Sequence, residues 1–345
     1  MKLKDFVIFN PRETLSKSKK YRKISMDQIK PFTRKIESNI FLKYSGGSKF
    51  RNGDTIFARI TPCLENGKTS FVSCLEKNEV AFGSTEFIIV RSKPSVSLPL
   101  FVYYLMVSKK IRDKAIISMT GSSGRERVQQ IALDNIIIPD YTVDYQQHIV
   151  NTIGSIDDLI ENYDKQLEKI KIILRDKYKS YDNLNKIKLG DVATIKTGKL
   201  NADACCQNGI YPFFTCSEKP LNINVYAFDG PSILLSGNGS QLGYLNFYDG
   251  KFNAYQRTYV IQSNKIYSIY ASLLCNIDQI INQACGSAIP YITKPMIENL
   301  YIFEFDKITE KIFKILIVKM QHMNKEKSLL IKLKQTLLNK YFTNQ

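Results

Sequence analysis

Two long stretches of apolar residues at heptad spacing constrain this chain more than any other feature of its sequence. In the first, residues 145–178, the apolar positions alternate in steps of four and three, and Gly154 is the only internal helix breaker. These positions are Ile149, Ile153, Ile156, Ile160, Tyr163, Leu167, Ile170 and Leu174. The pattern predicts one continuous helix with an apolar seam. Such a helix is roughly 50 Å long at 1.5 Å per residue, so we expect a spacer or a docking element.

The second stretch, residues 308–341, has a less regular seam of similar length. Lys319 and Glu326 interrupt it, while Ile308 and Ile315 extend it sideways. Its seam residues are Ile312, Leu316, Met323, Leu330, Leu333 and Leu337. Two matched long helices favour packing against each other, antiparallel or nearly so, as a coiled coil.

The segments that precede the two stretches match each other, which indicates an internal repeat. Residues 118–139 correspond to residues 282–303, so that Gly121 is paired with Gly286. Further matches pair GDTIFARIT (53–61) with GPSILLSGNG (230–239), and VAFGSTEFIIV (80–90) with NAYQRTYVIQ (253–262).

The repeat predicts a variable domain, a long helix, a second variable domain and a second long helix. We place these parts at residues 1–143, 144–183, 184–303 and 304–345. Within each domain, apolar and aromatic runs alternate with turn signals, and short helices are expected near residues 98–114 and 267–282. The predicted fold class is therefore α+β, with two tandem α/β domains separated by two long helices that form an antiparallel coiled coil.

The charge of the chain favours a polyanionic partner. Its 345 residues include 49 Lys and Arg against 32 Asp and Glu, a formal net charge of +17. Such a charge attracts polyanions over a Debye length of roughly 8–10 Å. Nucleic acid is the first candidate and an anionic membrane surface the second. A compositional bias toward Lys, Ile, Asn and Tyr, as an AT-rich genome produces, is the alternative that the charge leaves open.

Membrane and metal signals are weak. No apolar run approaches the ~20 residues that span a bilayer, and the first apolar run ends at Phe9, too short for a signal peptide. The seven cysteines contain no CxxC pair, and His148 and His322 lie far in sequence from the cluster at residues 205–216. No metal site is predicted, and reduced thiols in a cytoplasmic protein fit this pattern better.

The chain lacks a recognisable catalytic constellation. The glycine-rich stretch at residues 237–239 reads as a hairpin turn, because a lone pattern of this kind is weak evidence for a cofactor loop. Asp140 has no convincing partner for the clustered carboxylates of a metal-dependent nuclease, and two histidines leave little room for acid–base chemistry. His148 opens the first long helix, where a structural or partner contact is expected. We predict a chain that is not an enzyme and binds no cofactor.

Several motifs together resemble one family. In the first half they are NPRETL (10–15), GGSKFRNGDTIFARITPCLENGKT (46–69), AFGSTEFIIVR (81–91) and IPDYTVDYQQHIV (138–150). In the second half they are IKLGDVATIKTGK (187–199), ILLSGNGS (233–240) and DGKFNAYQRTYVI (249–261). On these motifs the chain resembles the specificity (S) subunit of type I restriction-modification systems over nearly its whole length. The second half matches more loosely, since Ala288-Ile289-Pro290-Tyr291 replaces the polar GRERV of the first half.

The resemblance implies two target-recognition domains, each reading one half of a split, asymmetric site in double-stranded DNA. The long helices would set the gap and dock two modification (methyltransferase) subunits, with restriction subunits in the full complex and no membrane. This chain would be the non-catalytic subunit. On the helices, the residues expected to bind partners are Ile149, Ile153, Tyr163, Leu330 and Leu337.

Side-chain chemistry then selects candidates for DNA contact, because Arg suits guanine, Asn and Gln suit adenine, and Lys, Ser and Thr suit phosphate. In the first domain these are Arg59, Thr61, Lys68, Ser84, Ser122, Ser123, Arg125 and Arg127. In the second domain they are Ser236, Asn238, Ser240, Gln241, Gln256, Arg257, Tyr291 and Lys294. For each residue, a solvated loop position is the alternative.

Three other functions remain open on the sequence. A coiled-coil scaffold with an incidental basic surface would show no sharp sequence dependence in DNA binding. An RNA-binding module is less well supported, because interleaved aromatic and basic RNP-type patches are missing. An unpartnered variant S subunit, kept as a source of interchangeable recognition domains, shares all the motifs.

Overall fold

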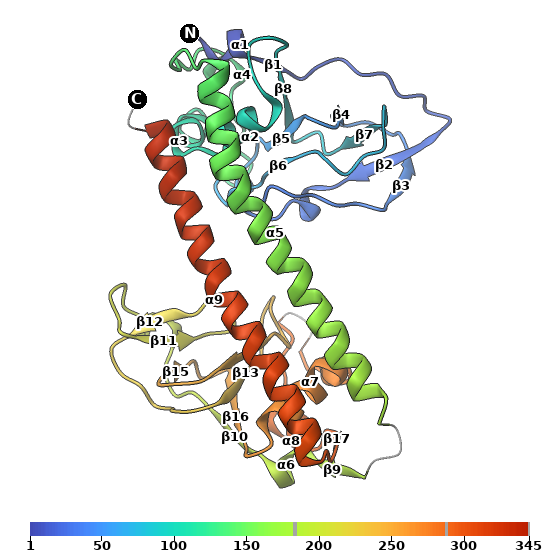
Figure 1. Cartoon of the computed structure of the whole chain (residues 1–345), viewed down its shortest axis with the longest axis vertical. Helices are drawn as coiled ribbons and strands as arrows, with labels where there is room; N and C mark the ends of the chain where they lie inside the picture. The colour runs from blue at the N-terminus through green and yellow to red at the C-terminus, as the bar shows by residue number, and fades with distance from the viewer. Residues whose placement is uncertain (182–184, 287–288, 344–345) are drawn as a thin grey trace. The chain divides into compact units, whose positions relative to one another are not determined.

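The computed structural model describes residues 1–181, 185–286 and 289–343. The chain forms two compact units: unit 1 comprises Met1–Asn162 with Lys327–Gln345, and unit 2 comprises Tyr163–Glu326 (Figure 1). The predicted domain boundary between residues 183 and 184, and Ala288 of the second-half motif, lie outside the described residues. Each unit therefore combines one α/β domain with one end of each long helix.

Unit 1 is built on two four-stranded sheets. The first is antiparallel throughout, and its order is β1 (Val7–Phe9), β8 (Phe87–Ser92), β5 (Thr55–Ala58), β6 (Thr69–Phe71). The second has the order β3 (Phe41–Lys43), β2 (Lys20–Ile24), β7 (Val80–Gly83), β4 (Lys49–Arg51), with β2 and β7 parallel. All of β5 and the first four residues of β8 are buried, and all of these except Thr55 are apolar, as expected for the central strands of a covered sheet.

The helices of unit 1 pack against the first sheet and against one another. They are α1 (Leu3–Phe6), α2 (Pro99–Val107), α3 (Lys109–Ile117) and α4 (Gln130–Asp134), with a 3-10 turn at η1 (Met26–Gln28). The single helix expected near residues 98–114 is two helices. Ser108 adopts an extended backbone between them, and its hydroxyl oxygen accepts a hydrogen bond from Ile111 N at 3.5 Å, which caps α3.

Unit 2 repeats the strand order of unit 1. Its main sheet is β10 (Thr194–Thr197), β16 (Thr258–Gln262), β13 (Ser232–Ser236), β14 (Leu245–Tyr248). A smaller sheet is β12 (Leu221–Ile223), β11 (Tyr211–Phe214), β15 (Asn253–Ala254), and a third pairs β9 (Lys186–Lys188) with β17 (Tyr301–Phe303). The helices are α6 (Leu189–Val192), η2 (Ala202–Ala204), α7 (Ile266–Ile281) and α8 (Lys294–Glu298). The tandem arrangement predicted from the repeat is therefore confirmed.

The two long helices, α5 (Val143–Lys179) and α9 (Lys307–Thr343), are antiparallel. In unit 1 the His148 ring Nε2 lies 3.2 Å from the Tyr341 hydroxyl, so the start of α5 meets the end of α9. In unit 2 the Tyr163 hydroxyl donates to Glu326 at 2.5 Å. A later residue of α5 thus meets an earlier residue of α9, as in an antiparallel pair. The contact expected at His148 is thus structural.

The predicted seam of α5 is confirmed, since most of its residues are buried and the others are partly buried. The predicted seam of α9 is partly wrong. Met323 is buried, but Ile312 and Leu333 are 37% and 47% exposed. The buried face is instead formed by Phe313, Ile317, Met320, Met323, Lys334, Leu338 and Phe342. Four of the predicted positions need a shift of one residue, because α9 also packs on the domain cores.

One polar pair lies in the buried face between the helices of unit 1. Lys334 Nζ donates to Asp157 Oδ1 at 2.6 Å, and both side chains are less than 8% exposed. The other carboxylate oxygen accepts from the Tyr104 hydroxyl at 3.0 Å. Burial and the charge of Asp157 raise the pKa of Tyr104, so this phenol stays protonated and donates.

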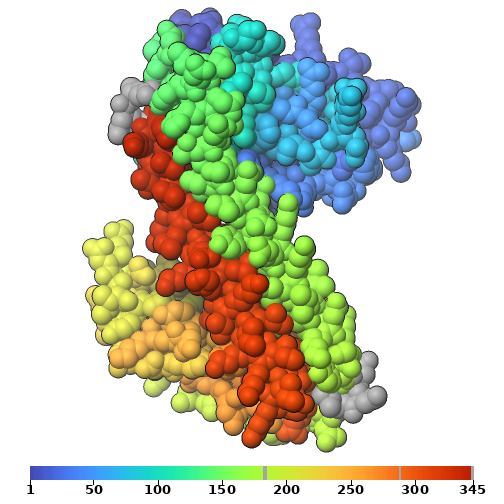
Figure 2. Space-filling model, viewed as in Figure 1, coloured from blue at the N-terminus to red at the C-terminus, as the bar shows by residue number. Residues whose placement is uncertain are grey.

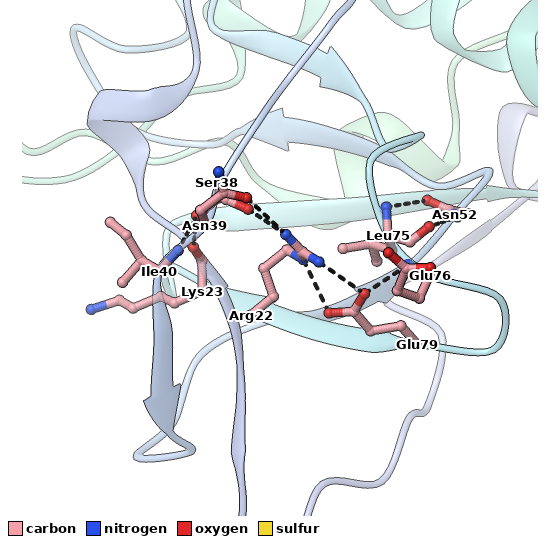
Figure 3. Close-up of polar contacts among 9 residues, drawn as sticks. All are labelled: Arg22, Lys23, Ser38, Asn39, Ile40, Asn52, Leu75, Glu76 and Glu79. Atoms are coloured by element: carbon pink, nitrogen blue, oxygen red, sulfur yellow. Dashed lines mark hydrogen bonds and ion pairs between the residues drawn. The ribbon is translucent and has the colours of Figure 1, made fainter.

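A buried arginine organises the second sheet of unit 1, as Figure 3 shows. Arg22 of β2 donates from Nη1 to the Ser38 carbonyl at 2.6 Å, and from Nε and Nη2 to the Glu79 carboxylate at 3.1 and 3.4 Å. The Glu79 carboxylate in turn accepts from Glu76 N at 2.7 Å. Hydrogen bonding to Glu79 raises the pKa of Arg22. This cation stabilises the fold and is only 9% exposed, so it is not a DNA contact.

Candidate nucleic-acid interface

Three of the residues predicted to contact DNA in unit 1 surround one acidic side chain, Glu86, which lies just before β8. Arg127 donates to its carboxylate from Nε at 3.1 and 3.0 Å and from Nη2 at 2.7 Å. Arg59, which follows β5, has its Nε 3.5 Å from Glu86 Oε2. The Ser84 hydroxyl oxygen accepts from Glu86 N at 3.1 Å. Residues far apart in sequence therefore meet at one corner of the sheet.

Thr61 lies beside this cluster and pairs with the segment that carries Arg127. Its backbone N donates to the Glu126 carbonyl at 3.0 Å, and its hydroxyl lies 3.4 Å from Glu126 Oε2. Arg127 Nη1 also donates to the Arg125 carbonyl at 3.3 Å. The loop that precedes Val128 is thereby held against the end of β5.

The tip of the same loop carries Ser122, Ser123 and Arg125, all exposed. In residues 1–181, 185–286 and 289–343, no group is within hydrogen-bond or ion-pair distance of the Arg125 guanidinium. Its five N–H donors are therefore available for a phosphate or a base edge. Of the loop residues named from the sequence, Arg125 has the freest cation.

The cluster around Glu86 keeps its carboxylate ionised. The hydrogen bonds from Arg127, with the charges of Arg127 and Arg59, lower the pKa of Glu86, although partial burial opposes the shift. The carboxylate is 23% exposed and the two arginine side chains are 40% and 39% exposed. The surface thus presents an acceptor between two guanidinium donors, which suits the edges of base pairs.

Lys68 forms its hydrogen bonds outside the cluster around Glu86. Its Nζ donates to the Met26 carbonyl at 2.8 Å, which ties the loop after β5 to the η1 turn. Its backbone carbonyl accepts from Ala58 N at 3.2 Å. The side chain is partly buried, so its ammonium is committed within unit 1.

In unit 2, several predicted residues converge on the end of β13. Gly237 N donates to the Arg257 carbonyl at 2.9 Å, and Asn238 and Tyr291 form an antiparallel bridge. Arg257 and Tyr291 are exposed, and Asn238 is partly exposed. In the described part of unit 2, the Arg257 guanidinium forms no ion pair or hydrogen bond. These side chains share one corner of the sheet.

The remaining candidates of unit 2 are placed differently. Ser240 and Gln241 are exposed in the connection between β13 and β14, and Gln256 is exposed beside Arg257. Ser236 is only 3% exposed within β13, and Lys294 pairs with Glu298 at 3.1 Å on α8. Ser236 therefore packs inside the domain, while the other residues lie at its surface.

Of the helix residues expected to bind partners, some are buried and others are partly exposed. Ile149 and Ile153 have no exposed surface, because both pack in the core of unit 1. Their side chains therefore have no surface for a partner to contact. Tyr163, Leu330 and Leu337 are partly exposed.

Glu86 is the residue that sequence reasoning missed. The repeat aligns the segment containing Glu86 with the segment containing Arg257. A change from an acid to a base at matching positions was the available signal. In the described residues, no group of three His, Cys, Asp or Glu side chains is placed to hold a metal, and all seven cysteines are free thiols. None of the described helices is both long and apolar enough to cross a membrane.

The sequence is similar to a known protein domain and to specificity subunits of type I restriction enzymes. Residues 181–316 match the type I restriction modification DNA specificity domain. A specificity subunit of the Escherichia coli type I restriction enzyme EcoDI is 46% identical over 118 residues, which cover 34% of this chain and 26% of that protein. The MjaIX specificity subunit of Methanocaldococcus jannaschii is 26% identical over 59% of this chain and 57% of its own length. The matches thus span less than two thirds of either relative.

Among solved structures, the S subunit of a type I restriction-modification system from M. genitalium has a similar fold. The alignment covers 100% of this chain and 96% of that one, with a TM-score of 0.61 and 16% sequence identity. This similarity confirms the predicted fold class. With the domain match and the relatives, it also confirms the resemblance to type I specificity subunits that the motifs indicated.

Proposed function

We propose that this chain is the non-catalytic, DNA-reading specificity subunit of a type I restriction-modification complex. Its two recognition domains, at about residues 1–143 and 184–303, each read one half of a bipartite, asymmetric site. The helices at 144–183 and 304–345 set the gap and dock two methyltransferase subunits, with restriction subunits joining the full complex in the cytoplasm. One observation carries the proposal: the DNA specificity domain matched over residues 181–316 has its main-sheet strand order repeated in unit 1.

The charge and the surface loops support DNA as the ligand. A net charge of +17 draws the chain to phosphates, and this part of the affinity falls steeply with salt. Arg125 in unit 1 and Arg257 in unit 2 offer exposed guanidinium groups for base edges or phosphates. Two weak readers on one chain gain affinity, because binding of the second is intramolecular.

The test is methylation directed by this chain. We expect its co-expression with a candidate methyltransferase subunit from the same genome to methylate one split DNA motif, detected by single-molecule methylome sequencing. The methylation should be absent when either chain is omitted. No new methylation, although the two proteins co-purify, would contradict the DNA-reading role and favour a scaffold.

A stripe of exposed apolar residues on α9 is the surface that we propose for methyltransferase docking. Ile308, Ile312, Ile315 and Val318 are 70%, 37%, 68% and 45% exposed, and their spacing places them on one side of the helix. Figure 2 shows α9, in red, at the surface of unit 2. Exposed apolar stripes of this kind mark protein interfaces.

We expect Ile315→Asp to weaken binding of the methyltransferase by about tenfold or more, because a carboxylate would be buried in the interface. Asn324→Asp is the matched control, since it adds the same charge at an exposed position of α9. Position 324 lies nine residues further along, which at 3.6 residues per turn is the opposite side of the helix. Titration of each variant against the methyltransferase measures the effect. Equal binding by both variants would rule out the stripe.

A further inference from the structure

Two backbone hydrogen bonds define the corner of unit 1 that carries the arginine–glutamate cluster. Arg59 N donates to the Glu86 carbonyl at 3.0 Å, which joins the end of β5 to the start of β8. The Arg59 carbonyl accepts from Val128 N at 2.8 Å, which adds the returning loop. Residue 127 is further paired in both directions with Thr120, at 2.9 and 3.1 Å.

Unit 2 repeats these hydrogen bonds with different residues. Gly237 N donates to the Arg257 carbonyl at 2.9 Å, and the Gly237 carbonyl accepts from Ile292 N at 2.8 Å. Tyr291 is paired in both directions with Cys285, at 2.8 and 2.9 Å. Three backbone positions are therefore equivalent in the two units. Unit 1 fills them with Arg59, Glu86 and Arg127, and unit 2 with Gly237, Arg257 and Tyr291.

The two sets of three residues have the same net charge but different hydrogen-bonding groups. Two arginines and one glutamate sum to one positive charge, and so do one arginine, one tyrosine and one glycine. The three positions therefore contribute the same formal charge toward DNA phosphates in each unit. The hydrogen-bond patterns differ, because unit 1 presents a carboxylate acceptor between two guanidinium groups, whereas unit 2 presents a single guanidinium beside a phenol.

We propose that these three equivalent positions make the two DNA half-sites different, with Glu86 and Arg257 as the residues that determine specificity. The inference rests on the proposed function. A carboxylate accepts from an exocyclic amino group such as cytosine N4, whereas a guanidinium donates to guanine O6 and N7. One backbone position that carries opposite charges thus favours different bases in otherwise similar domains.

The difference is built into the backbone of unit 2. A Cβ atom on Gly237 would lie 2.4 Å from the Arg257 carbonyl oxygen and 2.8 Å from the Tyr259 ring. The residue equivalent to Arg59 therefore cannot carry a side chain without moving β16. Unit 2 therefore has no side chain at the position of Arg59. The test changes Glu86, which is partly exposed, and Arg257, which is exposed.

The experiment compares methylomes directed by the intact complex with single substitutions in this chain. Glu86→Gln removes the charge and keeps the shape of the side chain. Arg257→Gln removes the charge in the other unit and shortens the side chain. We expect Glu86→Gln to make one base position in one half-site degenerate, with discrimination reduced about tenfold. Arg257→Gln should do this in the other half-site only. Asp27→Asn, which removes an exposed charge on the η1 turn, should leave the motif unchanged.

Two results would overturn the inference. If the wild-type complex methylates a split motif and both variants keep that motif unchanged, the three positions do not determine specificity. The same holds if both variants alter the same half-site. A wild-type complex that methylates no split motif would overturn the proposed function, and this inference with it. Thermal unfolding of each variant, followed by circular dichroism, checks that a lost motif is not a lost fold.

Discussion

Replacing Lys334 with alanine should lower the free energy of unfolding of unit 1 by about 3–5 kcal/mol. The reason is that Lys334 pairs with Asp157 at 2.6 Å, and both groups are almost completely buried. Removing the ammonium leaves a carboxylate in the interior with the Tyr104 hydroxyl as its remaining side-chain donor and the charge of Arg34 nearby. Hydrogen exchange of peptides from unit 1, measured along a denaturant series, gives the change.

Two variants separate the loss of the pair from the loss of a side chain. Lys332→Ala changes an exposed lysine of the same helix and should cost within about 0.5 kcal/mol. The double change Lys334→Met with Asp157→Asn removes both charges and keeps an acceptor for Tyr104, so most of the stability should return. Equal effects of Lys334→Ala and Lys332→Ala would show that Asp157 is not buried in solution.

Phe313→Ala should destabilise unit 2 by about 3–5 kcal/mol, since it removes a fully buried ring and leaves a cavity. Phe313 packs edge-on against Phe305, with ring centroids 5.3 Å apart, in the core that α9 shares with the domain. Calorimetry of the full chain should show a lower transition temperature for unit 2.

The matched control lies two residues along the same helix. Ile315 is 68% exposed, so Ile315→Ala should change stability by less than about 0.5 kcal/mol. If Ile315→Ala destabilised the unit as much as Phe313→Ala, the assignment of the buried face of α9 would be wrong. The pair of variants therefore tests the face of α9 that the structure corrects.

That correction shows what heptad spacing can and cannot predict. The seam of α5 was predicted residue by residue, because its isoleucines and leucines form one stripe. On α9, apolar residues follow two stripes, Ile312 and Ile315 on one and Phe313 and Ile317 on the other. Periodicity gives the helix in both cases, but it does not select which stripe faces a core.

The recognition corner was predictable in part. Arg59 and Arg127 were named from their loops, and Arg257 and Tyr291 from the matching loops of the repeat. Their mutual placement depends on backbone hydrogen bonds between segments about 20 to 70 residues apart, such as Arg59 N to the Glu86 carbonyl. Glu86 was missed because an isolated acid in a basic chain suggests nothing until its two arginine neighbours are known.

The division of the chain also fixes an order of folding during synthesis. Unit 2 is one continuous segment, Tyr163–Glu326, and has all its residues as soon as that segment leaves the ribosome. Unit 1 needs the part of α9 from Lys327 onward, which includes Leu338 and Phe342 of its core. At about 5–20 residues per second, the nascent first domain waits roughly 10–35 s for its last helix. The apolar surface that this helix will cover is exposed throughout that interval, so chaperones have their best opportunity to bind there.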